Sequence, residues 1–157
     1  MAPQAVPEGY NTVTPYLSVD DAAAAIDFYG RAFGATEQVR MSGPDGLIAH
    51  AELEIGDSRV MLADPLPQFT VRPPKELGGS SVGIFIYVEN VDEVVQQAID
   101  VGATPLMPPQ DMFWGDRFGA VTDPFGHVWQ IATHVEDVPP EEMEKRSREW
   151  MAELANA

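Results

Sequence analysis

His50 and Glu52 are the side chains in this sequence best suited to moving a proton. They stand two residues apart in the run from Leu47 to Ile55, and alternation along a strand places both on one face. An imidazole titrates near neutral pH and a carboxylate accepts protons. The pair could therefore act as general acid and base if both reached one substrate atom. The same pattern also fits a half-exposed strand with a polar outer face, and both interpretations stay open.

Aromatic rings beside a cation form a second group of interest. Phe113 and Trp114 are adjacent, Gly115 and Asp116 follow, and Arg117 closes the group. Rings offer a large contact area, and a guanidinium can hold an anion through two parallel hydrogen bonds, so the group predicts the rim of a ligand site. The alternative is structural: Asp116 and Arg117 fix a loop while Trp114 covers the edge of the core.

Further rings lie at alternating positions of expected strands. Phe85 and Tyr87 share one face of the run from Val82 to Val88, and Tyr16 lies in the first strand-like run. Gln130 is a polar residue within an apolar strand, which indicates a face that lines a cavity. A cavity lined by rings suits a planar or hydrophobic small molecule. The predicted ligand-binding residues are therefore Tyr16, Phe85, Tyr87, Phe113, Trp114, Arg117 and Gln130.

A tight turn positions Gln130. In the segment Asp123-Pro-Phe-Gly126, proline presets φ at about −65° and glycine accepts a positive φ without steric cost. The strand-like runs on either side then predict an antiparallel hairpin. Trp129 and Ile131 share one face of its second strand, which we expect to belong to the core.

Helices are indicated by apolar residues at helical spacing. Ser18-Val-Asp-Asp21 and Asn90-Val-Asp-Glu93 resemble capping boxes at two helix starts, and Gly34 and Gly102 supply the stops. A third helix is expected after Pro139, with an apolar stripe that must pack on this chain or across a dimer. The stripe consists of Met143, Ser147, Trp150, Met151 and Leu154.

The order of elements occurs twice. A strand, a helix ending in Phe33-Gly-Ala-Thr36 and three strands precede a second strand, a helix ending in Val101-Gly-Ala-Thr104 and three more strands. The predicted fold is α+β, with two βαβββ modules and a C-terminal helix. The predicted segments are an N-terminal arm (1–10), a first module (11–64), a proline-rich linker or lid loop (65–81), a second module (82–135) and a C-terminal helical segment (136–157).

These features resemble the vicinal oxygen chelate superfamily, which includes glyoxalase I, bleomycin resistance proteins, extradiol dioxygenases and fosfomycin resistance enzymes. The resemblance covers roughly residues 10–135 and includes Ile26-Asp-Phe-Tyr29 and Asp123-Pro-Phe-Gly-His127. The segments Asp111–Arg117 and Ile131–Asp137 are most similar to the PhnB-like branch. The resemblance implies that the modules form an open curved mixed sheet, the glyoxalase/bleomycin resistance fold, with its site on the concave face.

Metal-dependent members of that superfamily place a His, Gln or Glu ligand on the first and fourth strand of each module. The resemblance puts these four positions at Thr14, Met61, Gly83 and Gln130. Only Gln130 could ligate a metal, and an amide is a weaker donor than imidazole or carboxylate. We therefore expect no metal at the inherited positions and no cofactor. A divalent metal held elsewhere is the alternative.

Composition excludes several classes of partner. The net charge of −16 makes nucleic acid and anionic membrane surfaces unfavourable partners. The sequence has no cysteine, which excludes disulfides and thiolate metal sites and suits the cytoplasm. It also has no signal-peptide pattern and no apolar run of about 18 residues. The family resemblance favours a homodimer.

Two functions follow from these observations. The first is a bleomycin-resistance-like protein that binds a small aromatic or antibiotic-like molecule in a concave cleft, without the family metal centre. The second is an enzyme, either a glyoxalase-like lyase or isomerase or a dioxygenase. It would use a relocated metal, or His50 and Glu52 as acid–base groups. The missing ligands and the added rings favour binding, while catalysis stays an open question.

Overall fold

A computed structural model describes residues 1–157 and contains the two predicted modules. Module 1 consists of β1 (Tyr16–Ser18), α1 (Ala22–Phe33), β2 (Thr36–Ser42), η1 (Pro44–Gly46), β3 (Ile48–Ile55) and β4 (Ser58–Ala63). Module 2 consists of β5 (Gly83–Tyr87), α3 (Val91–Asp100), β6 (Thr104–Asp111), β7 (Asp116–Thr122) and β8 (Val128–His134). The remaining helices are α2 (Pro74–Leu77) and α4 (Pro140–Ala155).

Each module forms one four-stranded mixed sheet. The strand orders are β1-β4-β3-β2 and β5-β8-β7-β6, with the first pair of each sheet parallel and the other pairs antiparallel. The predicted α+β class with repeated βαβββ modules is therefore confirmed. Because β1 and β5 each pair on one side only, both modules present the free edge of their first strand.

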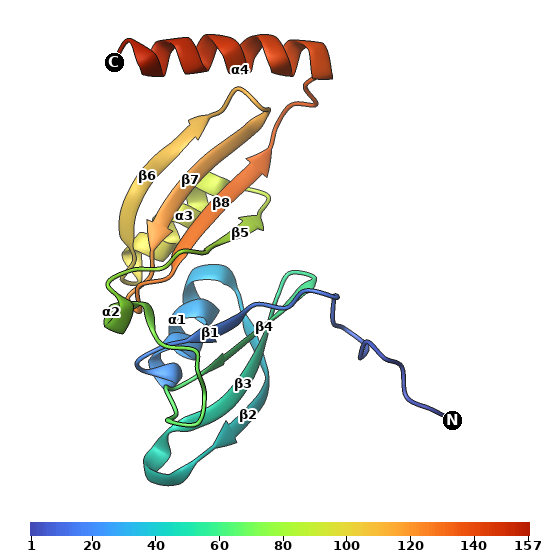
Figure 1. The fold of residues 1–157 in the computed structure, drawn as a ribbon, viewed down its shortest axis with the longest axis vertical. Helices are drawn as coiled ribbons and strands as arrows, with labels where there is room; N and C mark the ends of the chain where they lie inside the picture. Colours follow the sequence, from blue (N-terminus) through green and yellow to red (C-terminus); the bar gives the residue numbers. More distant parts are fainter.

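A helix covers one face of each sheet, and the other face stays open. Leu17, Ala51 and Leu62 are aligned across module 1 and buried. In module 2, Trp129 and Ile131 of β8 are buried. Helices α1 and α3 contact each other, so one hydrophobic core runs through both modules. Figure 1 shows the two sheets end to end, with α3 behind β7 and β8 of module 2 and α1 of module 1 near the junction between the modules.

The predicted hairpin is present and joins the modules. Asp123 accepts backbone hydrogen bonds from Phe125 and His127 across the turn, both at 2.9 Å. Its other oxygen accepts bonds from the Tyr29 hydroxyl of α1 at 2.6 Å and from Trp129 Nε1 at 2.9 Å. One buried carboxylate thus fixes the turn and ties module 1 to module 2.

One helix start differs from the sequence prediction. Asn90 caps α3 as expected, accepting a bond from the Glu93 amide, and Gly34 ends α1 in the left-handed conformation. Ser18, however, is the last residue of β1, and the cap of α1 is Asp21, which accepts from the Ala24 amide. The prediction of a cap at Ser18 is wrong because a strand already holds the backbone of that residue.

The peripheral segments also differ from expectation in part. The linker is not a plain loop, because it contains the single-turn helix α2. Helix α4 forms as predicted, but it has no buried residue and lies across the far end of module 2 (Figure 1). The N-terminal arm extends away from module 1 in the same view. No helix combines the length and apolar character needed to cross a membrane.

Candidate functional site

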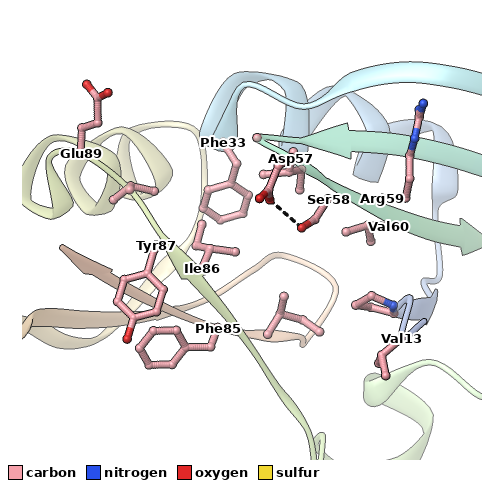
Figure 2. Close-up of a pocket in the computed structure, with 15 residues that line it drawn as sticks. Val13, Phe33, Asp57, Ser58, Arg59, Val60, Phe85, Ile86, Tyr87 and Glu89 are labelled. Atoms are coloured by element: carbon pink, nitrogen blue, oxygen red, sulfur yellow. Dashed lines mark hydrogen bonds between the residues drawn. The ribbon is translucent and has the colours of Figure 1, made fainter. Parts of the chain in front are cut away.

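The largest groove of the molecule lies between the two modules and has a volume of about 720 Å³. Phe85 and Tyr87 project from β5 on one side, and Phe33 of α1 lies beyond Ile86 (Figure 2). The turn between β3 and β4 supplies the polar rim with Asp57 and Ser58. The lining is Val13, Pro15, Phe33, Ile55–Val60 and Ile84–Glu89. Such a volume and apolar lining suit a small organic molecule.

Strand alternation explains why rings reach this groove. Ile84 and Ile86 pack on the shared core, so Phe85 and Tyr87 must face the open side. These two side chains are 43% and 65% exposed, although both are large and apolar. Their ring centroids are 5.1 Å apart, a distance typical of paired rings. The strand therefore presents an aromatic surface to the groove.

Asp116 holds this aromatic surface in place. Its Oδ2 accepts hydrogen bonds from the Tyr87 hydroxyl and from Trp114 Nε1, each at 3.0 Å, and Oδ1 lies 2.8 Å from His134 Nδ1. The carboxylate is buried, whereas Tyr87 and His134 are exposed. The hydrogen bond to Asp116 raises the pKa of Tyr87, so its hydroxyl stays protonated and remains a donor.

The rings continue over the open face of module 2. Phe85 stacks on Phe118 at 5.8 Å, and Trp114 meets Phe118 edge-on at 6.0 Å. Phe113 then bridges Trp114 and Trp150 of α4, at 5.2 and 5.4 Å. Gln130 lies on the same face beside Phe85 in the strand register. The open face of module 2 is therefore mainly aromatic.

The open face of module 1 carries a chain of hydrogen bonds. His50 Nε2 lies 3.0 Å from Glu52 Oε1, and His50 Nδ1 lies 2.9 Å from the Tyr16 hydroxyl. Tyr10 of the N-terminal arm donates its hydroxyl to the other oxygen of Glu52. Because a carboxylate accepts only, the ring carries its proton on Nε2, and Tyr16 then donates to Nδ1. Burial raises the pKa of Tyr16, which keeps that donor protonated.

The four positions that correspond to metal ligands fit a divalent cation poorly. Met61 lies beside Tyr16, and Gln130 beside Phe85. Gly83 has no side chain, and a Cβ there would lie 2.9 Å from Gln130 Oε1. Thr14 precedes β1 and donates to the Asn11 carbonyl. Hydroxyl, thioether and amide groups are weak ligands beside imidazole or carboxylate. No group of three or more His, Asp or Glu side chains is arranged to hold a metal.

The structure brings most of the predicted site residues onto open faces. Phe85, Tyr87, Phe113, Trp114 and Gln130 gather on module 2, while Tyr16 joins His50 and Glu52 on module 1. Arg117 lies apart from them, because Asp92 of α3 and Asp111 hold its guanidinium on the helix-covered side. Binding by these residues stays a prediction.

Sequence reasoning left four participants out of the predicted site residues. Tyr10 and the Asp116–His134 pair interact with site residues, and Arg59 lines the groove. Alternation could have identified Asp116, since it must face opposite to Arg117. Nothing in the sequence places Tyr10 against Glu52.

The chain is similar to known proteins in both sequence and fold. A family model described as Glyoxalase/Bleomycin resistance protein/Dioxygenase superfamily matches residues 9–131. Uncharacterized protein Mb0911c of Mycobacterium bovis is 45% identical over 135 residues, which cover 84% of this chain and 89% of that protein. The crystal structure of TioX from Micromonospora sp. ML1 is 29% identical with a TM-score of 0.63, covering 80% of this chain and 99% of TioX. The PhnB protein from Bacillus cereus has the same fold, with 18% identity, a TM-score of 0.59 and coverage of 78% and 99%.

Proposed function

The chain belongs to the glyoxalase/bleomycin resistance protein/dioxygenase superfamily, and on that premise we propose that it binds a small aromatic or antibiotic-like molecule in the groove between its modules. The observation that carries this proposal is the pair Phe85 and Tyr87, exposed in a groove of about 720 Å³. When another flat apolar surface packs against exposed rings, the burial of apolar area stabilises the complex. Asp116 supports the pair, since a fixed Tyr87 loses little rotamer freedom when a ligand binds.

Calorimetric titration with 1-naphthol and with cyclohexanol tests the proposal. We expect saturable binding of the aromatic alcohol and much weaker binding of the aliphatic one. The variants Phe85→Ala and Tyr87→Ala should each weaken 1-naphthol about tenfold, the cost of one ring contact. Phe69→Ala is the matched control, because Phe69 is an exposed ring outside the groove. Equal affinities for the two alcohols would refute the proposal.

The proposed binding does not use the inherited metal positions, because Met61, Gly83 and Gln130 offer a poor donor set. Metal analysis of protein purified without added metal tests this part. Near-stoichiometric zinc, nickel or iron that is lost in His50→Ala would overturn it and favour a relocated metal centre.

Acid–base catalysis is the second candidate function, supported by the chain Tyr16–His50–Glu52. A ligand proton would pass to the Tyr16 oxygen while the Tyr16 proton passes to His50 Nδ1. The resulting imidazolium would be stabilised by the Glu52 carboxylate. The aromatic groove gives the ligand-binding proposal precedence, since the cavity beside Glu52 has a volume of only about 370 Å³, against about 720 Å³ for the groove.

A general proton-transfer probe distinguishes the two candidates. A base removes the C3 proton of 5-nitrobenzisoxazole, the N–O bond breaks, and 2-cyano-4-nitrophenolate forms. Catalysis that falls at least tenfold in His50→Ala and Tyr16→Phe would support the enzyme. Glu54→Gln is the matched control, because Glu54 lies on the same strand but pairs with Arg59. A rate equal in all variants would contradict acid–base catalysis by this chain.

We also propose a cytoplasmic homodimer. Trp150, Met151 and Leu154 of α4 are exposed, and a second copy is the partner that would cover this stripe. The lack of cysteine suits a reducing compartment. Sedimentation equilibrium should give twice the chain mass, and Met151→Glu together with Leu154→Glu should give monomers. A monomeric wild-type protein would refute the dimer.

A further inference from the structure

Strand β5 leaves one edge of its main chain free. It pairs with β8 on one side and with no strand on the other. The amide of Val88 donates to the Ala132 carbonyl at 2.8 Å, and in a parallel pair every second residue of a strand bonds to the same neighbour. Phe85 and Tyr87 have the opposite parity to Val88. Their N–H and C=O groups therefore point away from β8.

The groove described above runs along this free edge. Its lining includes the consecutive residues 84–89, so both faces of β5 and the main chain between them border it. The opposite wall consists of the turn between β3 and β4 and of Val13 and Pro15, which precede β1 (Figure 2). Neighbouring strands of a sheet lie about 4.8 Å apart. A groove of about 720 Å³ beside a strand edge therefore suits a short extended chain.

The other edge strands carry features that hinder pairing, whereas β5 carries none. Strand β6 contains Pro105, Pro108 and Pro109 and has two register shifts. Strand β2 contains Glu37 and Arg40 and also has two register shifts, and β1 is only three residues long. Strand β5 has five residues without proline or charge, and it pairs with β8 without a shift. Because proteins usually block a free edge, an unblocked edge inside a groove indicates a binding role.

We infer that β5 binds a short extended peptide as an additional strand, and that the ligand of the groove is therefore an aromatic peptide. This inference rests on the proposed aromatic binding and specifies the ligand class. A ligand residue opposite Phe85 or Tyr87 places its side chain on the same face of the sheet, with the two Cβ atoms about 5 Å apart. An aromatic side chain there packs on the exposed ring, while the ligand main chain bonds to the free N–H and C=O groups of the strand.

Charge specifies the ends of such a peptide. The chain has a net charge of −16, and Asp57 and Glu89 line the groove. Arg59 is the single cation of the lining, and Glu54 already pairs with it. A peptide with amino groups and an amidated carboxyl terminus is therefore favoured over an acidic one. A second copy of the chain fits poorly as the occupant, because its own β5 lies within the same kind of groove.

The test uses the peptide Lys-Phe-Thr-Phe-Lys amide and three derivatives, each N-methylated at one of the central residues. Calorimetry on the unchanged full chain should show saturable binding of the parent peptide. Only every second residue of an added strand bonds to its neighbour, in either orientation. The two Phe derivatives should therefore behave alike and the Thr derivative oppositely. One kind should bind at least about tenfold more weakly than the parent, and the other within about twofold.

Variants of the protein separate the edge from the rings. Tyr87→Ala removes a ring, whereas Tyr87→Pro removes the ring and the N–H that faces the groove. Proline is tolerated where a strand N–H points away from the ladder. Tyr87→Pro should therefore bind the peptide about tenfold more weakly than Tyr87→Ala, while both bind 1-naphthol equally. Phe69→Ala is the matched control and should bind the peptide like wild type, because Phe69 lies outside the groove. If Tyr87→Pro does not fold, the methylated peptides still decide.

Two results would overturn the inference and leave aromatic binding intact. One is an equal effect of N-methylation at all three residues, whether large or absent. The other is failure of the parent peptide to bind to protein that binds 1-naphthol. Failure of both the peptide and 1-naphthol would instead refute the proposed function, and strand addition with it.

Discussion

The open faces of the two modules differ, although the modules repeat one topology. Module 1 presents Tyr16, His50 and Glu52 joined by hydrogen bonds. Module 2 presents stacked rings, with Phe85 and Phe118 at their centre. The helix-covered faces, by contrast, share one apolar core. The two modules therefore keep the same topology and share one core, whereas their open faces carry different side chains.

A carboxylate organises each open face, but in a different environment. Glu52 is partly exposed and accepts from Tyr10 and His50. Asp116 is buried and accepts from Tyr87, Trp114 and His134. A buried carboxylate depends on its partners more strongly than an exposed one. The difference indicates a positioning role for Asp116 and leaves Glu52 accessible to proton exchange.

The largest effect on stability is expected at the contact between the two modules. Asp123→Ala removes four hydrogen bonds to one buried carboxylate, including the bond from Tyr29 of the other module. We expect a loss of about 4 kcal/mol in the free energy of unfolding, measured by urea denaturation. Asp20→Ala is the control, because its exposed pair with Lys75 is worth less than about 1 kcal/mol. A loss below about 1 kcal/mol for Asp123→Ala would contradict the importance of this contact.

The next effect separates the two faces. Asp116→Asn should destabilise the protein by about 2–3 kcal/mol, because the amide cannot accept from all three donors. Glu52→Gln should cost about 1 kcal/mol or less, since water can replace the carboxylate there. Urea denaturation of both variants gives the comparison. If Glu52→Gln were the more damaging change, the roles assigned to the two carboxylates would be reversed.

The family and the fold could be predicted from the sequence because both are indicated by patterns of residues that lie close together in the chain. Period-two and helical patterns located the elements, and Asp123-Pro-Phe-Gly126 identified the hairpin. The strand-like pattern of the sequence runs from Thr12 to Val19, but β1 begins only at Tyr16, because Pro15 has no amide proton. The prolines of β6 are tolerated because β6 is an edge strand.

The candidate site could be predicted only in part, because its contacts join distant residues. Sequence alternation placed His50 and Glu52 on one face, but Tyr16 and Tyr10 reach them from 34 and 42 positions away. Arg59 Nε and Nη1 are buried without a hydrogen-bond partner, which is equally a property of packing. Residue types at fixed spacing indicate which side chains share a strand face, whereas partners from other strands require the assembled sheet.

A smaller effect should appear as a pH dependence of module 2. The hydrogen bonds of His134 to Asp137 and to Asp116 raise its pKa in the folded protein. Its stabilisation is therefore complete below about pH 6.5, the ordinary value, and is lost as the pH rises through the higher folded pKa. The difference in Tm between wild type and His134→Gln should shrink from about pH 5.5 to about pH 9, which lie about one unit below and about two and a half units above that ordinary value. A constant difference would show that His134 is not charged in the folded state.

The smallest effect is expected at Arg117, which the sequence placed in the ligand site. Successive side chains of a strand point to opposite faces, so a chain that turns Asp116 toward the rings must turn Arg117 toward α3. Arg117→Met should therefore leave the affinity for 1-naphthol within about twofold of wild type, as for other surface changes. Calorimetry on the same scale as Phe85→Ala measures this. A tenfold loss would mean that Arg117 leaves Asp92 to reach the ligand, and the division between the open face and the helix-covered face of module 2 would then have to be abandoned.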